Sequence, residues 1–395
     1  MAHVGLLLIA FSFVFLVIRV SASCARGQGQ CRVFTMCCVF YFFSWCSLSP
    51  GLLLFEVDFD DDVHMKLQLS DECSSNEDCA AGLYCFSCIS MFTGSRCVRS
   101  TITEQFKLIN NSLPFNKYAF LTTHNSFAIN KINPDGIPRV TFTNQEDSIT
   151  QQLHNGVRAL MLDVYDYEGD IWLCHSFKGK CHAYTAFGLA IDALKEIETF
   201  LSTNPSEIIT LILEDHVETM NGLTRVFEES GLKKYWFPVA KMPQDGGDWP
   251  LVKDMVANNQ RLVVFTSMKS RQESEGIAYQ WNYMVENQYG NQGMEQGICF
   301  NRNQSAPLND LTKSLVLINH FSSIPVKEAT CKHNSDELIN MLHTCYSAAG
   351  NRWSNFVAVD YYKRSNGGGA FQAVDTLNGE LLCRRTDVHR CEVGP

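Results

Sequence analysis

The chain contains short apolar runs separated by segments in which apolar residues recur every three or four positions. Continuous runs rich in Val, Ile and Leu, without alternating polar residues, are typical of strands in a sheet that is buried on both faces. Such runs cover residues 118–124, 159–165, 171–175, 208–214, 262–267, 315–319 and 356–361. The stretch 158–176 also predicts a strand, a short acidic turn and a second strand.

Helical patterns lie between these runs. They cover 148–156, 183–205 and 335–350, which end at Gly156, Pro205 and Gly350. The last segment starts on Ser335 and Asp336, residue types that cap the first turn of a helix. From about residue 104 to residue 383 strands and helices alternate, which predicts parallel strands joined by crossover helices, in a barrel or a doubly wound sheet.

Polar residues gather where the predicted strands end, while the bodies of the strands are apolar. They are His124 and Asn125, Asp163, His175, Glu214 and Asp215, Ser267, Asn319 and His320, and Asp360, with Lys269 just beyond its strand. The carboxyl ends of barrel strands converge on one face, where active sites lie, whereas an open sheet would bring fewer of them together. This distribution favours a barrel.

The residue types at these ends point to chemistry on a phosphodiester. Asn125, Asp163 and Glu214 offer only oxygen atoms, which suit a hard cation such as Ca²⁺ or Mg²⁺. Two histidines, His124 and His175, suit general acid–base catalysis, in which one takes a proton and the other gives one. Each residue alone also has a structural explanation, such as capping a turn or pairing with a nearby charge. No G-x-S-x-G, H-E-x-x-H or P-loop motif is present.

The N-terminus predicts export. Residues 1–23 contain an apolar run followed by small residues, as in a signal peptide cleaved near Ala22 or Ser23. Residues 24–66 are apolar and cysteine-rich and then acidic. We favour a non-native stretch, such as translated intron sequence, over a membrane segment, because Pro50 and Gly51 interrupt the run and no basic residues flank it.

Residues 67–100 form a cysteine-rich segment with the spacing C-x5-C-x5-C-x2-C-x8-C. A zinc site is the alternative to disulfides, but export and the absence of a nearby histidine favour disulfides. Five cysteines is an odd number, so one pairs elsewhere or stays free. The twelve cysteines beyond Lys66 permit complete pairing. One pair, Cys174 with Cys181, would close a loop around His175.

Net charge and targeting signals narrow the partners. A charge of −10 argues against nucleic acid and against docking on anionic lipid, but not against binding a single lipid headgroup. Export places the chain outside the cell or at its surface, with no stable span in the mature chain. The sequons at Asn110 and Asn303 predict glycosylation. Residues 384–395 form a tail without the apolar stretch of a GPI signal.

At these residues the chain resembles the phosphatidylinositol-specific phospholipase C X-domain superfamily, in particular its secreted plant-type phosphodiesterases with a cysteine-rich N-terminal segment. The matching stretches are FLTTHNSFA, GVRALMLDVYDYEGDIWLCHSF, NPSEIITLILEDHV, YMVENQYG and NFVAVDYY. Together they span nearly all of residues 104–383. The resemblance implies an α/β fold, a distorted (β/α)8 barrel, that cleaves glycerophospho-inositides through attack by the inositol 2-hydroxyl.

Carried over by position, His124 and His175 match the catalytic histidines, His124 as base and His175 as acid. Asn125, Asp163 and Glu214 match ligands of the Ca²⁺-dependent branch. Asp360 matches the aspartate that orients the first histidine in the metal-independent branch. Lys269 would bind the substrate and stabilise charge in the transition state.

One position departs from the family pattern. Met161 stands where the Ca²⁺-dependent branch has a glutamate, and a thioether neither binds Ca²⁺ well nor takes a proton. We therefore expect weak Ca²⁺ binding at most. A phosphoric diester hydrolase acting on a lipid or a soluble headgroup is the first hypothesis. A catalytically silent protein that binds a headgroup or glycan, and a structural cell-surface protein, are the alternatives.

Overall fold

The computed structural model describes most of the chain beyond residue 65: residues 66–68, 71–81, 83–88, 95–99, 112–130, 138–385, 388 and 391. Of residues 1–65 it describes the backbone of three strands that pair antiparallel in a sheet of their own, β1 (Leu6–Phe11), β2 (Val14–Cys24) and β3 (Cys31–Phe42). Cleavage of a signal peptide and the origin of residues 24–66 stay predictions. Asn110 lies outside the described residues.

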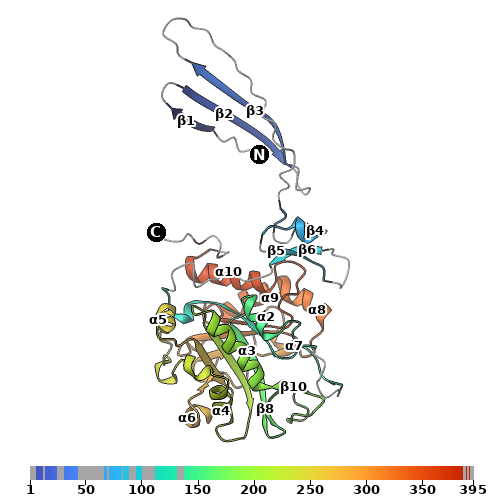
Figure 1. Cartoon of the computed structure of the whole chain (residues 1–395), viewed down its shortest axis with the longest axis vertical. Helices are drawn as coiled ribbons and strands as arrows, with labels where there is room; N and C mark the ends of the chain where they lie inside the picture. Colours follow the sequence, from blue (N-terminus) through green and yellow to red (C-terminus); the bar gives the residue numbers. More distant parts are fainter. Residues whose placement is uncertain are drawn as a thin grey trace.

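A curled sheet with eight parallel strands on its path lies at the centre of the main body (Figure 1). The strands follow one another in space as β13 (Ala278–Tyr279), β12 (Leu262–Thr266), β11 (Ile209–His216), β8 (Ala159–Tyr167), β7 (Phe120–Thr123), β16 (Phe356–Val359), β15 (Leu315–His320) and β14 (Met284–Glu286). Each pair along this path is parallel. Although β13 and β14 are consecutive in the chain, they form the two ends of the sheet. The prediction of a distorted (β/α)8 barrel is confirmed.

A hairpin extends this sheet beside β8. Glu168 and Gly169 connect β8 to β9 (Asp170–Cys174), and both have positive φ, at 46° and 80°. Two left-handed residues form the type of turn whose twist matches that of the flanking strands. Because Val164 pairs with Leu173 in the antiparallel register, the chain returns to the level of Asp163 just before His175. The strand β10 (Ala186–Leu189) then pairs with β9.

Helices cover the outside of the sheet (Figure 1). They are α2 (Ile149–His154), α3 (Ala190–Thr203), α4 (Gly222–Glu229), α5 (Val252–Ala257), α6 (Arg271–Ser274), α7 (Gly290–Gly293), α8 (Lys327–Lys332), α9 (Leu338–Ala348) and α10 (Ala370–Cys383). The helix predicted over 183–205 is shorter, because its first part is β10. The helix start expected at Ser335 falls on a break, since Ser335 has non-helical φ and ψ within a π-helical turn between α8 and α9.

Alternation along each strand divides the core into two clusters. Inside the curl of the sheet pack residues such as Phe120, Ala159, Ile212, Phe265, Leu317 and Phe356. Between the sheet and its helices pack residues such as Leu121, Leu160, Leu211, Val264, Ile318 and Val357. Side chains two positions apart share a face, so the residue that follows an inner apolar position by two also points inward. This rule aims Asp163, Glu214 and Asp360 at the mouth of the barrel, whereas Asp215 and His320 follow outer positions and point toward the helices.

The cysteine-rich segment is joined to the barrel body. Its strands β4 (Glu72–Cys73), β5 (Leu83–Phe86) and β6 (Ser95–Arg99) form a small sheet, which lies beside the helices α8, α9 and α10 (Figure 1). Disulfides link Cys73 to Cys85 and Cys79 to Cys97, and Cys88 bonds to Cys331 of α8. The prediction of disulfides is therefore confirmed, and the fifth cysteine of the segment pairs with the barrel.

The remaining cysteines after residue 66 are also paired. The bonds are Cys174–Cys181, Cys299–Cys345 and Cys383–Cys391. Complete pairing of these cysteines agrees with the oxidising compartment inferred from the sequence. Within the described part of the chain, no helix has the length and apolar character needed to cross a bilayer.

Candidate active site

Two carboxylates enter the barrel mouth from neighbouring strands. Asp163 on β8 pairs in register with Glu214 on β11. Two positions earlier on the same strands, Met161 and Ile212 pack in the inner cluster. Asp163 and Glu214 therefore point inward, directly above an apolar floor.

The first histidine is held by a buried carboxylate. His124 follows β7 directly, and its Nδ1 donates to Oδ1 of Asp360, just after β16, at 2.9 Å. The Asp360 side chain is 3% exposed and the His124 side chain 20%. Asn144 Nδ2 also donates to the same carboxylate oxygen, at 2.9 Å. A proton fixed on Nδ1 leaves Nε2 of His124 as the basic atom that faces the mouth.

An aromatic ring fixes the plane of this imidazole. Phe321, just after β15, stacks on His124 with 3.6 Å between ring centroids and 5° between planes. The ring also belongs to the inner apolar cluster, which holds it in place. His124 is thus restrained on its face by Phe321 and at Nδ1 by Asp360.

Asn125 lies between the two histidines and Asp163. Its φ of 42° places it in the left-handed region, and its side chain is buried. With the amide oxygen toward the imidazoles, it accepts from Nε2 of His175 and of His124 at 3.0 and 3.2 Å, while its nitrogen donates to both oxygens of Asp163 at 3.0 and 3.2 Å. This orientation suits His124 after it has taken a proton.

The opposite orientation of the Asn125 amide suits neutral imidazoles. Its nitrogen then faces His175 Nε2 at 3.0 Å, and its oxygen faces the carboxylate of Asp163. Two acceptors face one another in this arrangement, so it requires a proton on Asp163 or a cation between the oxygens. The amide therefore connects the protonation of the histidines with the charge on Asp163.

His175 reaches the mouth from the end of β9. Its Nδ1 lies 3.0 Å from Oγ1 of Thr141, and the rings of Phe127 and Phe187 contact it edge-on. Burial, and to a smaller extent the neighbouring His124, lower the pKa of His175 to about 4. A substrate phosphate would oppose this shift, because an anion stabilises the imidazolium.

The carboxyl pair is asymmetric. Burial and the charge of Glu214 raise the pKa of Asp163 well above its usual value. A hydrogen bond from His216 Nε2, at 3.1 Å, is the main cause that lowers the pKa of Glu214. The Glu214 side chain is 51% exposed, as expected for a group that stands in an open mouth. Of the two carboxyls, Asp163 therefore holds a proton more readily than Glu214.

The oxygen set is compatible with a hard cation. Asn125, Asp163 and Glu214 converge with oxygen atoms only, and Asn125 can turn its oxygen toward Asp163. Half-buried Met161 lies on the same face of β8 and adds no oxygen ligand from its side chain. These three residues offer at most five side-chain oxygens, fewer than the six to eight ligands that Ca²⁺ prefers, so water or substrate would complete the shell.

Two further predicted residues make no contact with the histidines and carboxylates of the mouth. Lys269 is exposed in the turn after β12, and no side-chain contact of the described residues joins it to the histidines or to the carboxylates. Asn303 is exposed, but Ser305 of its sequon is buried, where its Oγ accepts from the backbone N–H of Glu286 at 2.9 Å. Substrate binding by Lys269 and glycosylation of Asn303 stay predictions.

Sequence reasoning missed a charged pair at the end of β14. Glu286 points inward two residues after Met284 of the inner cluster, and Arg302 Nη1 donates to its Oε1 at 2.8 Å. The short strand lies within the stretch YMVENQYG, and the carboxylate at its end could have been recognised from the sequence as a strand-end polar residue. The arginine has no such signal, because it arrives from a loop sixteen positions later.

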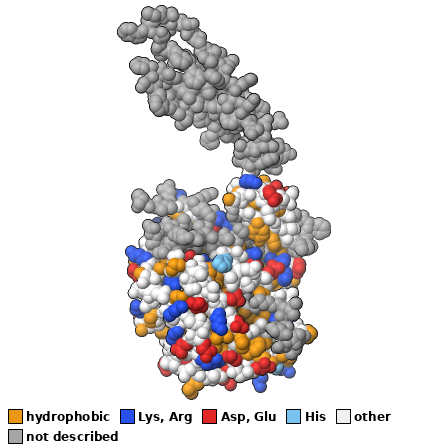
Figure 2. All heavy atoms as spheres, in the orientation of Figure 1, with side chains coloured by type: hydrophobic (Ala, Val, Ile, Leu, Met, Phe, Trp, Pro, Cys, Tyr) orange, Lys and Arg blue, Asp and Glu red, His pale blue; other side chains and the backbone are white. Residues whose placement is uncertain are grey.

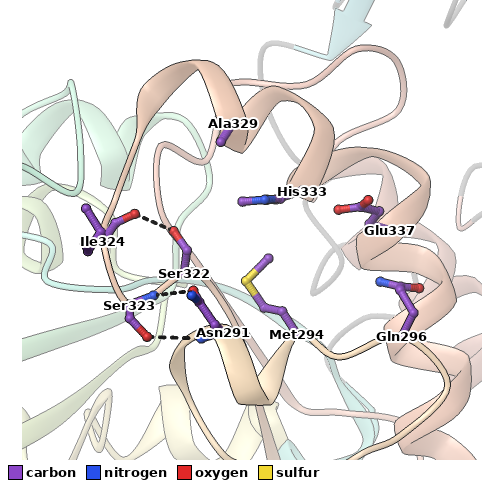
Figure 3. A pocket seen from close by; sticks show the side chains of 9 residues that line it. All are labelled: Asn291, Met294, Gln296, Ser322, Ser323, Ile324, Ala329, His333 and Glu337. Carbon is purple, nitrogen blue, oxygen red and sulfur yellow. Dashed lines mark hydrogen bonds between the residues drawn. The ribbon is translucent and has the colours of Figure 1, made fainter.

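A cavity of about 480 Å³ lies beyond the end of β15. Figure 3 shows it between the loop after β15 and the helix that carries His333 and Glu337, with Met294 at its wall. Ser323 and Asn291 face one another across two hydrogen bonds of 3.2 and 3.0 Å. Neither Phe321 nor His124 is among the residues that line this cavity.

Comparison with known proteins agrees with this geometry. The family model described as PI-PLC X 1 matches residues 114–378. A PI-PLC X domain-containing protein of Arabidopsis thaliana is 50% identical over 329 residues, which cover 83% of this chain and 77% of that protein. The chain belongs to the PI-PLC X family.

More distant relatives also match this PI-PLC X chain. An uncharacterized secreted protein of Arthroderma benhamiae is 25% identical over 301 residues, covering 71% of this chain and 67% of the relative. Among solved structures, the phosphatidylinositol-specific phospholipase C from Listeria monocytogenes is 14% identical with a TM-score of 0.47, covering 69% of this chain and 96% of that chain. The region that the family model matches contains all the mouth residues described above, which are His124, Asn125, Asp163, His175, Glu214 and Asp360.

Proposed function

We propose that the protein is a secreted phosphoric diester hydrolase of the phospholipase C type, which acts on a glycerophospho-inositide or a similar phosphodiester. The observation that carries this proposal is the arrangement of two histidines whose Nε2 atoms face one amide atom of Asn125. One of them, His124, is backed by buried Asp360, as expected for a general base. Loss of phosphodiester cleavage in the His124→Ala and His175→Ala variants tests this proposal.

The steps follow from these positions. His124 Nε2 takes the proton of a substrate hydroxyl, whose oxygen attacks the phosphorus and displaces the second ester oxygen. That leaving oxygen takes a proton from His175, whose protonated form the phosphate charge favours. A divalent ion held by Asn125, Asp163 and Glu214 would supply positive charge beside the phosphate when bound.

An apolar rim around the mouth favours a lipid substrate over a soluble one. Among the described residues, nine large apolar side chains are exposed, and eight of them lie on loops that follow the carboxyl ends of strands. These eight are Val140, Phe142, Phe177, Met220, Tyr289, Ile298, Ile324 and Val326. Val140 and Phe142 flank Thr141, which contacts His175, so the rim is continuous with the site.

The surface charge agrees with docking through apolar contact. Figure 2 shows Lys and Arg side chains interspersed with Asp and Glu on the face in view, and the chain carries a net charge of −10. Attraction to anionic lipid is therefore not the driving force on that face. Insertion of rim side chains would depend on the apolar area that is buried.

Replacing Phe142 and Phe177 together by serine should lower hydrolysis of phosphatidylinositol in neutral vesicles by about 10-fold or more, because burial of one such side chain contributes about 1.5–3 kcal/mol. Hydrolysis of soluble glycerophosphoinositol should change far less. The matched control is Leu311→Ser, since Leu311 is exposed but precedes β15 at the other end of the barrel. Equal loss on both substrates would contradict a role in docking.

Calcium should stabilise the protein more at pH 8 than at pH 5. A carboxyl whose pKa is raised by folding stabilises the ion-free protein at low pH, and this contribution is lost as pH rises through the folded pKa. Binding of Ca²⁺ requires ionised Asp163, so the ion competes with this proton. At 100 times its Kd, an ion adds about 2.7 kcal/mol. Thermal unfolding with Ca²⁺ or chelator, in the wild type and in Asp163→Asn, measures this effect.

The variant Asp163→Asn should lose the pH dependence of the calcium effect. A shift of the same size at both pH values in the wild type would show that Asp163 does not exchange a proton for the ion. If Ca²⁺ changes the melting temperature at neither pH, the oxygen set does not hold calcium.

One observation favours a second candidate, a binding protein without turnover. Met161 stands where the Ca²⁺-dependent branch of the family has a glutamate, and burial raises the pKa of Asp163, which favours its neutral form. Such a site would still accept a phosphorylated headgroup. Binding of the headgroup without cleavage, in a folded protein, would favour this candidate.

A further inference from the structure

Arg302 presents a fixed guanidinium at the barrel mouth. Its Nη1 donates to Glu286 at 2.8 Å and its Nε to Gln304 Oε1 at 3.2 Å. The rings of Trp281 and Tyr289 lie 5.3 and 4.8 Å from the guanidinium carbon. The plane is therefore restrained by two hydrogen bonds and two aromatic rings, with little freedom left to lose on binding.

The anchor of this arginine is itself rigid. Glu286 has a fully buried side chain, and besides Arg302 it accepts from Gln280, Trp281 and Asn319 at 3.2, 2.9 and 2.9 Å. Four donors satisfy its two oxygens, so the carboxylate is not available to a ligand. Glu286 therefore holds the guanidinium of Arg302 in one place.

One edge of the guanidinium is unused. The two hydrogen bonds of the side chain use Nη1 and Nε, and Nη2 makes no hydrogen bond with the described residues. The Arg302 side chain is 13% exposed, and its Nη2 is not fully buried, so a ligand can reach this edge. A pair of N–H groups on a restrained guanidinium is suited to an anionic oxygen.

The free edge belongs to the same mouth as the histidines. Glu286 and Asn319 point inward at the ends of β14 and β15, on the face of the inner cluster. Along the curled sheet β14 lies four strands from β8, which carries Asp163. Burial and Glu214 raise the pKa of Asp163, and the charge of Arg302 opposes that rise. The arginine thus faces the carboxylates from the opposite wall.

We propose that Arg302 is a substrate-binding residue of this site, whose Nη2 edge receives an anionic oxygen of the phosphodiester. This inference rests on the proposed function and adds the residue that recognises the phosphate. A fixed positive charge opposite Asp163 and Glu214 would hold the phosphate between the two histidines. It would also stabilise the charge that develops on the phosphate oxygens during attack.

Direct binding tests the inference without requiring turnover. The probes are myo-inositol 1-phosphate and myo-inositol, titrated calorimetrically into the full-length protein, its Arg302→Gln and Arg302→Lys variants, and an Arg385→Gln control. Arg385 is an exposed arginine beyond α10. The wild type and the control should prefer the phosphate, and Arg302→Gln should lose most of that preference, about 10-fold or more. Arg302→Lys should retain part of it.

Three results would overturn the inference: a wild type without preference for the phosphate, an Arg302→Gln variant that keeps its preference within twofold, or an Arg302→Lys variant that behaves like wild type. Folding of each variant is checked by circular dichroism and melting temperature. If Arg302→Gln does not fold, the comparison of Arg302→Lys with the wild type decides, because this variant keeps the positive charge beside Glu286.

Turnover separates this inference from the proposed function. In an active enzyme, Arg302→Gln should lower kcat/KM by about 10²–10³-fold, and added guanidinium ion should restore part of the loss. A merely structural role would lower stability without such rescue. Phosphate binding that depends on Arg302 in an inactive wild type would uphold the inference and refute catalysis. Unchanged turnover in Arg302→Gln would refute the inference and leave catalysis intact.

Discussion

Replacing His124 by alanine should lower kcat/KM for phosphodiester cleavage by about 10²–10⁴-fold, the usual contribution of a positioned general base. The expected loss is large because Nε2 is the basic atom that Asp360 and Phe321 hold in place at the mouth. The variant Asp360→Asn should also lose activity, since an amide can favour the wrong tautomer of His124. Initial rates on phosphatidylinositol measure both effects.

The control for this prediction is His343→Ala. His343 is exposed on α9, where its ring contacts Trp353, away from the barrel mouth. Like His124→Ala, this variant lacks one imidazole, but it should keep wild-type activity. If His124→Ala remains as active as His343→Ala, another group acts as the base.

Breaking the Cys88–Cys331 disulfide with two serines should lower the free energy of unfolding by about 2–5 kcal/mol. The bond closes a separation of 243 residues, and long loops lose the most chain entropy in the unfolded state. It also joins the cysteine-rich segment to α8. Three residues beyond Cys331, Asn334 Nδ2 donates to the backbone oxygen of Asp360 at 3.0 Å.

Activity should fall together with stability in this variant, because α8 supports the loop that carries Asp360. The matched control replaces Cys383 and Cys391, whose bond spans a separation of 8 residues. The same chain-entropy model gives this pair about half the stabilisation. Urea unfolding monitored by circular dichroism compares the two variants. Equal stability of wild type and the Cys88–Cys331 variant would show that the segment contributes nothing to the barrel.

Much of the barrel could be predicted from the sequence, because buried parallel strands are continuous apolar runs. All seven predicted strands are present, with ends that differ by a few residues. The strands that were missed, β10, β13 and β14, are only two to four residues long and carry no periodic signal. The segment 183–205 shows this limit. Its first apolar residues belong to the strand β10, and only those that follow belong to the helix α3.

The barrel mouth could be predicted in outline but not in its contacts. Strand ends placed His124, Asp163 and Glu214 together, and the structure brings these residues to one mouth. The bridging position of Asn125 depends on a left-handed backbone that local sequence does not specify. Arg302 could not be found in this way, because its place is fixed by contacts with Glu286 across a loop. The exposed position of Lys269 likewise depends on the turn after β12.

The departure at Met161 acquires a physical meaning in the structure. Without a carboxylate at that position, the site has one negative charge fewer, and the raised pKa of Asp163 lowers the negative charge further. Arg302 adds positive charge from the opposite wall. A site of this kind would depend less on calcium than one with a full set of carboxylates.

The most direct test is phosphorus NMR of the purified protein mixed with phosphatidylinositol, with Ca²⁺ and with chelator. Attack by a neighbouring hydroxyl predicts a cyclic inositol phosphodiester as the first product, formed by the wild type and absent with His124→Ala and His175→Ala. A folded wild-type protein that binds inositol phosphate, yet forms no product in either condition, would contradict the assignment as a phosphodiesterase.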